Sequence, residues 1–131
     1  MTSSPKRAAL YARCASVNEQ RQFTSIDQQL TEGREMADRC GMEVVGMYSD
    51  WGLAGEALDR PAFAALKEFV AREQIGTVIC TDMLRLARDS DLAWQAVLQL
   101  QRCGADVALS GPDVLLRITD EEPQPATGAM R

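Results

Sequence analysis

The chain has 131 residues, of which 46% are hydrophobic and 25% charged, with a net charge of −5 and no histidine. We expect one soluble globular domain; a membrane span is excluded, because no apolar run approaches about 20 residues, and so is acid–base catalysis by an imidazole. No long apolar segment follows residues 1–7, so we expect no signal peptide and a cytoplasmic location.

The sequence offers no pattern for a metal or cofactor site. The cysteines lie far apart, with no Cys-x-x-Cys pair, so a zinc site is not expected. Neither a Gly-x-Gly-x-x-Gly motif nor a Walker lysine is present. The acidic balance also argues against a free-standing nucleic-acid binder, because affinity for phosphates comes mostly from surplus Lys and Arg.

Strand and helix patterns alternate along the first half of the chain. The apolar run 8–12 predicts a buried strand. Ser25, followed three residues later by Gln28, forms a capping-box pattern that predicts the start of a helix. Gly41 predicts the end of this helix, and residues 43–48 predict a second strand.

The alternation continues through the second half. Residues 50–55 form a glycine-containing loop, and a helix opens at 59–61, where a proline is tolerated in the first turn. The remaining expected elements are a strand at 77–80, a helix at 90–102 ended by Gly104, and strands at 105–109 and 114–118. Residues 120–131 have no core pattern, so we expect a domain at 1–119 followed by a flexible tail at 120–131.

This order of elements predicts an α/β fold, with a mostly parallel sheet of four or five strands and helices on both faces. Functional sites in such sheets form at the carboxyl ends of the strands. The polar residues that fall just past the expected strand ends are Arg13, Ser16, Asp50, Asp82 and Arg85.

Four arginines adjoin expected strand or helix ends: Arg13, Arg60, Arg85 and Arg88. A guanidinium stays charged and presents a planar fork that suits phosphate oxygens, so several could stabilise a five-coordinate phosphorus without a metal. The simpler interpretation is that each is a solvated residue paired with a carboxylate. Asp50 and Asp82 are likewise either general bases or satisfied carboxylates.

Several short motifs occur in order between residues 7 and 110. They are Tyr11-Ala12-Arg13, Ser16-x-x-x-Gln20, Ser25-Ile26-x-x-Gln29, Tyr48-Ser49-Asp50 with Gly52 and Gly55, Arg60-Pro61-x-Phe63, and Arg85-Leu86-Ala87-Arg88-Asp89. Together they resemble the catalytic domain of the serine recombinases, the resolvase/invertase family. The resemblance implies a resolvase-like fold and DNA cleavage and rejoining through a 5′-phosphoserine link, with no metal or cofactor.

The resemblance also implies roles for individual residues. Ser16 would be the nucleophile; Arg13, Arg85 and Arg88 would bind and activate the phosphate; and Gln29, Asp50 and Arg60 would shape the site. Asp82 is the nearby candidate for a base or an ion-pair partner. The implied partners are DNA, held through a region outside this chain, and further subunits in full-length members; alone, this chain is expected to be a monomer or weak dimer.

Two positions depart from the family pattern. The family serine follows its arginine by two positions, where this chain has Ala15, whereas the spacing to Gln20 selects Ser16. Either one residue is inserted before an intact nucleophile, or the nucleophile has become alanine. In addition, Leu84 stands where the family has an acid before the first arginine of the last motif.

Three functions therefore stay open. The first is a DNA recombinase domain, favoured by the four arginines, because a pure scaffold has little reason to keep such a cluster. The second is an inactive homologue that acts as an interaction or regulatory module, favoured by Leu84 and the acidic charge. The third is an unrelated doubly wound domain that binds a small phosphorylated ligand.

Overall fold

The structure is a computed structural model that describes residues 6–14, 25–51, 60–87, 90–111 and 116–118, the last range by its backbone alone. Several positions that the sequence singled out lie outside them: Ala15, Ser16, Gln20, Gly52, Gly55, Arg88 and the expected tail at 120–131.

Five strands form one sheet, in the order β2-β1-β3-β4-β5. Their bounds are Lys6–Cys14 for β1, Met42–Trp51 for β2, Thr77–Cys80 for β3, Asp106–Leu109 for β4 and Leu116–Ile118 for β5. The first four strands run parallel, and β5 pairs antiparallel with β4. The predicted mostly parallel sheet is confirmed.

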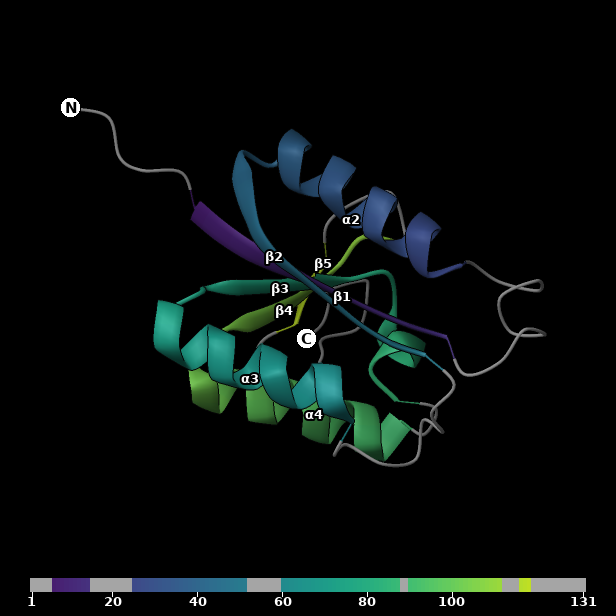
Figure 1. Cartoon of the computed structure of the whole chain (residues 1–131), viewed down its shortest axis with the longest axis vertical. Helices are drawn as coiled ribbons and strands as arrows, with labels where there is room; N and C mark the ends of the chain where they lie inside the picture. The colour runs from purple at the N-terminus through teal and green to yellow at the C-terminus, as the bar shows by residue number, and fades with distance from the viewer. Residues whose placement is uncertain (1–5, 15–24, 52–59, 88–89, 112–115, 119–131) are drawn as a thin grey trace, which may run out of the picture.

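Helices cover both faces of this sheet, as predicted (Figure 1). α2 (Ile26–Arg39) lies on one face, while α3 (Pro61–Glu73) and α4 (Ser90–Cys103) lie side by side on the other. A short 3-10 helix, η1 (Met83–Arg85), follows β3. No helix of the described part is both long and apolar enough to cross a membrane.

The predicted helix signals are confirmed in detail. The Ser25 hydroxyl accepts from the Gln28 amide at 3.1 Å, and the Gln28 side chain accepts from the Ser25 amide at 3.0 Å. Gly41 and Gly104 follow α2 and α4 with φ angles of +73° and +112°, which an L side chain rarely adopts. These two glycines therefore end the helices that they were expected to end.

The two longest strands run further than expected. Arg13 and Asp50 do not lie past the strand ends but inside β1 and β2, where they are partners in the parallel register. The prediction is wrong here because it took charged residues as the end of pairing. The backbone pairing of β1 with β2 includes both residues. Their charged side chains can lie inside the strands because each forms hydrogen bonds with other parts of the chain.

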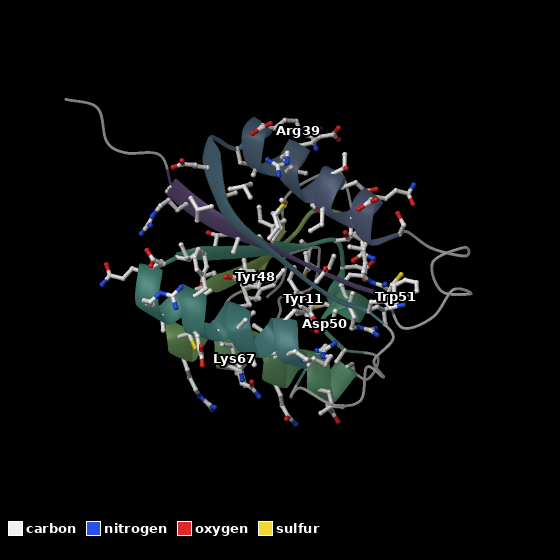
Figure 2. All side chains as sticks on the ribbon, viewed as in Figure 1. Tyr11, Arg39, Tyr48, Asp50, Trp51 and Lys67 are labelled. Carbon is white, nitrogen blue, oxygen red and sulfur yellow. The ribbon has the colours of Figure 1, made fainter. Side chains whose placement is uncertain are left out.

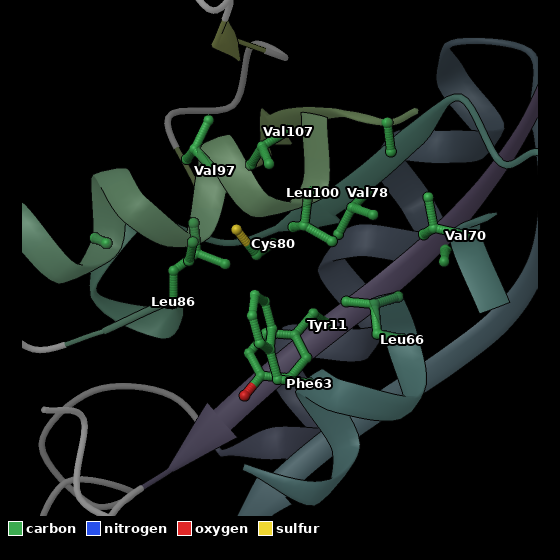
Figure 3. Packing of buried hydrophobic residues seen from close by; sticks show 14 of the residues in the cluster. Tyr11, Phe63, Leu66, Val70, Val78, Cys80, Leu86, Val97, Leu100 and Val107 are labelled. Carbon is green, nitrogen blue, oxygen red and sulfur yellow. The ribbon is translucent and has the colours of Figure 1, made fainter. Parts of the chain in front are cut away.

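The core lies in two layers. The larger cluster packs between the sheet and α3 and α4, and includes Tyr11, Phe63 and Leu86 (Figure 3). A smaller cluster around Leu10 and Ile79 packs beneath α2. Successive side chains of a strand point to opposite faces, so Arg13 follows Tyr11 onto the α3 and α4 side.

Candidate active site

Arg13 is almost completely buried, at 1% exposed, and binds the backbone of the turn after β3. Its Nη2 donates to the Leu84 carbonyl at 2.7 Å, and its Nε donates to the Arg85 carbonyl at 3.3 Å. A guanidinium can serve two carbonyls at once because its N–H groups diverge in one plane. Arg13 therefore holds η1 against the end of β1.

The Arg85 side chain in turn binds the backbone of Arg13. Its side chain is 2% exposed, and Nη1 donates to the Arg13 carbonyl at 2.8 Å. Its Nε lies 3.4 Å from Oδ1 of Asp82, whose side chain is 49% exposed. The two arginines thus exchange hydrogen bonds with each other's backbone, and Asp82 supplies a carboxylate at the edge of the site.

Gln29 joins α2 to the same point. Its Oε1 accepts from the Arg13 amide at 3.1 Å, and its Nε2 donates to the Arg13 carbonyl at 3.1 Å. Both groups are buried, so the side chain satisfies backbone atoms that would otherwise lose a partner. The structure brings the Gln29 side chain to the backbone of Arg13, while its expected role in shaping an active site stays a prediction.

Arg60 is buried as well, at 2% exposed, immediately before α3. Its Nη2 donates to the Leu86 carbonyl, and its guanidinium carbon lies 5.7 Å and 5.5 Å from the ring centres of Tyr11 and Phe63. Within the described part of the chain, Nε and Nη1 have no hydrogen-bond partner. A buried cation with unsatisfied donors is costly without an acceptor, so this arrangement can bind an anion.

Asp50 is committed to three donors and is not available as a base. It is 4% exposed and accepts from the Tyr11 hydroxyl at 2.7 Å, the Ala62 amide at 3.0 Å and the Phe63 amide at 3.1 Å. Figure 2 shows Tyr11 and Asp50 next to each other near the start of α3. Of the two interpretations open for Asp50, the satisfied carboxylate fits the structure.

Tyr11 is a site residue that the sequence reasoning did not single out. Burial, together with the hydrogen bond to Asp50, raises the pKa of its hydroxyl well above the usual range, although the nearby Arg60 works in the opposite sense. It therefore stays a neutral donor. The signal was present in the sequence: Tyr11 precedes Arg13 by two positions, which places both side chains on one face of β1.

Leu84 presents its side chain outward, 48% exposed, while its carbonyl binds Arg13. The position where the family has an acid thus has no carboxylate. Asp82, two residues earlier, holds Arg85 instead. In the described residues no three Cys, Asp or Glu side chains gather in a way that could hold a metal ion.

Three successive carbonyls, those of residues 84–86, bind Arg13 and Arg60. Arg13 binds those of Leu84 and Arg85, and Arg60 binds that of Leu86. These guanidiniums also hold η1 in place, so a domain without catalytic activity would have a structural reason to keep them. Ser16 and Arg88 lie outside the described residues, so their positions relative to this cluster stay predictions.

Comparisons with known proteins agree with this fold. Residues 8–123 match the family model "Resolvase, N terminal domain". A Bacillus subtilis (strain 168) protein named "Putative DNA recombinase" is 35% identical over 80 residues, which are 61% of this chain and 15% of that protein. The chain thus spans a small part of that relative's length.

Solved structures give the same result. The N-terminal catalytic domain of TP901-1 integrase is 25% identical, with a TM-score of 0.71 over 84% of this chain and 81% of its own. A resolvase family site-specific recombinase from Streptococcus pneumoniae, 19% identical, shares the fold with a TM-score of 0.67 over 84% of this chain and 75% of its own. Together with the family match over most of its length, this shows that the chain belongs to the resolvase family of serine recombinases and carries the N-terminal catalytic domain.

Proposed function

We propose that this chain is the catalytic domain of a site-specific DNA recombinase that cleaves a strand through a 5′-phosphoserine link at Ser16 and rejoins it by the reverse reaction. The observation that carries the proposal is Arg60. Its buried guanidinium keeps Nε and Nη1 without a partner among the described residues, and it lies over the ring of Tyr11 in β1, the strand that precedes Ser16 in the sequence. A phosphodiester supplies the acceptors that these donors lack.

In the proposed cleavage, Ser16 Oγ forms a bond to phosphorus and the bond from phosphorus to the 3′ oxygen breaks. The serine loses its proton, and the leaving oxygen takes one up to become a free 3′-hydroxyl. Negative charge grows on the phosphoryl oxygens in the transition state, and fixed cations stabilise it. Arg60, Arg85 and Arg13, with Arg88 by resemblance, supply that charge.

Asp82 is the proposed carboxylate for handling the serine proton or for orienting Arg85. Its side chain is half-exposed, and Oδ1 lies 3.4 Å from Arg85 Nε, so the carboxylate can contact both this guanidinium and a bound substrate. Asp50 is unsuited, because its oxygens already accept three hydrogen bonds.

DNA binding and assembly are proposed to need more than this domain. With a net charge of −5, the chain lacks the surplus cations that hold a duplex, so we assign the main DNA contacts, and the self-association of subunits, to other segments. We take residues 1–119 as the catalytic domain and place residues 120–131 outside it. A DNA substrate also supports a cytoplasmic location.

The test is a search for the covalent adduct. The full gene product is incubated with a pool of randomised, nicked duplexes, and trapped protein–DNA species are mapped by mass spectrometry. We expect an adduct at Ser16 that is absent in Ser16→Ala and retained in Ser49→Ala, a matched change at an exposed serine of β2. No adduct with the natural sequence would overturn the proposal.

The second candidate, an inactive homologue, is favoured by the outward-facing Leu84. Ala15→Ser separates the two functions, because it restores a serine at the family position. An adduct that appears only in this variant would show that the domain keeps its binding site but has lost the nucleophile. An adduct already present at Ser16 would exclude this second function.

A further inference from the structure

α3 begins without a cap from its own N-terminal residue. Arg60 occupies the N-cap position, and its side chain makes no capping hydrogen bond. Pro61 has no N–H to satisfy, and the Ala64 amide donates to the Arg60 carbonyl at 2.9 Å. The amides of Ala62 and Phe63 remain, and a buried helix end cannot leave such donors without acceptors.

Asp50 supplies both missing acceptors from a different element. Oδ1 accepts from Ala62 at 3.0 Å and Oδ2 from Phe63 at 3.1 Å, so one carboxylate at the end of β2 caps the whole first turn. Its negative charge also lies at the positive end of the helix dipole. An N-cap residue is normally Ser, Thr, Asp or Asn, whose side chain folds back onto these amides. Because Asp50 caps the helix, the N-cap position can hold an arginine, whose side chain binds the Leu86 carbonyl and not the amides of the helix.

Tyr11 fixes this carboxylate from β1. Its hydroxyl donates to Oδ2 at 2.7 Å, so Oδ2 is shared between the tyrosine and the Phe63 amide. The Tyr11 ring packs edge-on against the Phe63 ring at 5.6 Å and lies beneath the Arg60 guanidinium. Contacts from two strands thus determine where α3 starts and where Arg60 lies.

We propose that Tyr11 and Asp50 are positioning residues that act through the first turn of α3 to fix the Arg60 guanidinium, so that its buried Nε and Nη1, which have no acceptor among the described residues, can bind an anion. The identity of that anion as the scissile phosphate rests on the proposed function. The positioning itself is a property of the free chain and is testable without DNA.

The first test is NMR spectroscopy of the 131-residue chain with inorganic phosphate as the probe. We expect the Arg60 Nε–H signal to shift on titration with phosphate. In Tyr11→Phe and Asp50→Asn this shift should be lost or strongly weakened. In Asp50→Asn, one of the Ala62 and Phe63 amides should also exchange about 5- to 30-fold faster, as expected for a lost N-cap interaction. The carboxamide in Asp50→Asn accepts through one oxygen only, so one of the two amides loses its partner.

Tyr48→Phe is the matched control. Tyr48 faces Tyr11 in the β1–β2 register, but its ring packs against Phe69 at 5.6 Å, away from Asp50. The same loss of a hydroxyl should leave the Arg60 signal and both amides unchanged. If Tyr48→Phe and Tyr11→Phe behave alike, the positioning proposal is overturned.

Arg60→Ala tests the direction of the dependence. Because Asp50 rather than Arg60 caps the helix, removing the Arg60 side chain should leave the exchange of the Ala62 and Phe63 amides within about twofold of the natural chain. Faster exchange in this variant would mean that the helix start depends on Arg60, which contradicts the proposal. This measurement also stays informative if Asp50→Asn fails to fold.

The catalytic readout follows once the adduct assay is running. Tyr11→Phe should slow adduct formation by about 10- to 100-fold, the usual effect of a misplaced catalytic group, with DNA affinity within about twofold of the natural protein. An unchanged rate would overturn the proposal. If the natural protein forms no adduct while the NMR results hold, only the recombinase function fails and the positioning of Arg60 stands.

Discussion

The Gln29 side chain forms hydrogen bonds with the backbone N–H and C=O of Arg13, as a neighbouring strand would do with its own backbone. β1 pairs with β3 only as far as Leu10, three residues before Arg13. Past that point the Gln29 amide donates to and accepts from the Arg13 backbone. The end of β1 therefore pairs with β2 along one edge, and beyond the pairing with β3 it gains hydrogen bonds from α2.

Gln29→Ala is expected to lower the free energy of unfolding by about 1–3 kcal/mol, because it removes two buried hydrogen bonds to the backbone of Arg13. Urea unfolding measures this loss. Gln95→Ala, a change of the same type at an exposed position of α4, should stay within about 0.5 kcal/mol of the natural chain. Equal effects of the two substitutions would refute the role assigned to Gln29.

The buried hydroxyl of Tyr11 predicts a loss of stability in alkali. Its pKa is raised in the folded chain, so above about pH 10 the unfolded chain loses this proton while the folded chain keeps it. Proton release then favours unfolding, and the stability advantage over Tyr11→Phe should shrink by about 1.4 kcal/mol per pH unit. Unfolding free energies of both proteins at pH 8 to 11 test this, and a constant difference contradicts it.

At the scale of elements, the sequence predicts most of what forms. Hydrophobic periodicity located the three helices, and Ser25, Gly41 and Gly104 marked helix boundaries correctly, because capping and positive φ are local effects. Local patterns could not show that Asp50 belongs to β2 and caps α3. That contact joins residues twelve or more positions apart, so only the packed structure contains it.

Gly111 extends the pairing of β3 and β4 beyond their ends. Its amide donates to the Thr81 carbonyl at 2.8 Å, and a Cβ on Gly111 would lie 2.6 Å from that oxygen. Because a backbone atom blocks the space, Gly111→Ala should destabilise the chain by about 1–3 kcal/mol. Gly76→Ala, where nothing lies within 4 Å, should be neutral or slightly stabilising in the same thermal unfolding experiment. A harmless Gly111→Ala would contradict the close approach.

At the scale of the whole molecule, the sequence predicted that Arg13 and Arg85 lie at one edge of the sheet, and the two residues do contact each other there. The rule that parallel strands carry their sites at their carboxyl ends brought Arg13 and Arg85 together from the order of elements alone. It could not show what they bind. Besides Asp82, their acceptors include the carbonyls of residues 84 and 85 and of Arg13 itself, and residue types do not reveal which main-chain groups a side chain will bind.

The layered fold also predicts the reactivity of the four thiols. Cys14 and Cys80 lie buried in the central strands, and burial raises the pKa of Cys80. Cys40 is exposed, and Cys103 is half-buried at the end of α4. With a thiol reagent at pH 8, Cys40 should react first and Cys103 next. Cys14 and Cys80 should react only when the whole domain unfolds. Rapid labelling of Cys80 in the folded chain would show that the core is looser than described.

The hydrogen bonds from Arg13 and Arg60 to the carbonyls of residues 84–86 have an evolutionary consequence. Removing either guanidinium strands buried carbonyls, so selection for folding alone would retain both residues after a lineage had stopped cutting DNA. Mutations could then remove the nucleophile and the arginines at very different rates. A genome survey that takes these arginines as evidence of activity would therefore include inactive homologues among the active recombinases. The residue at the nucleophile position separates active from inactive members better than these arginines do.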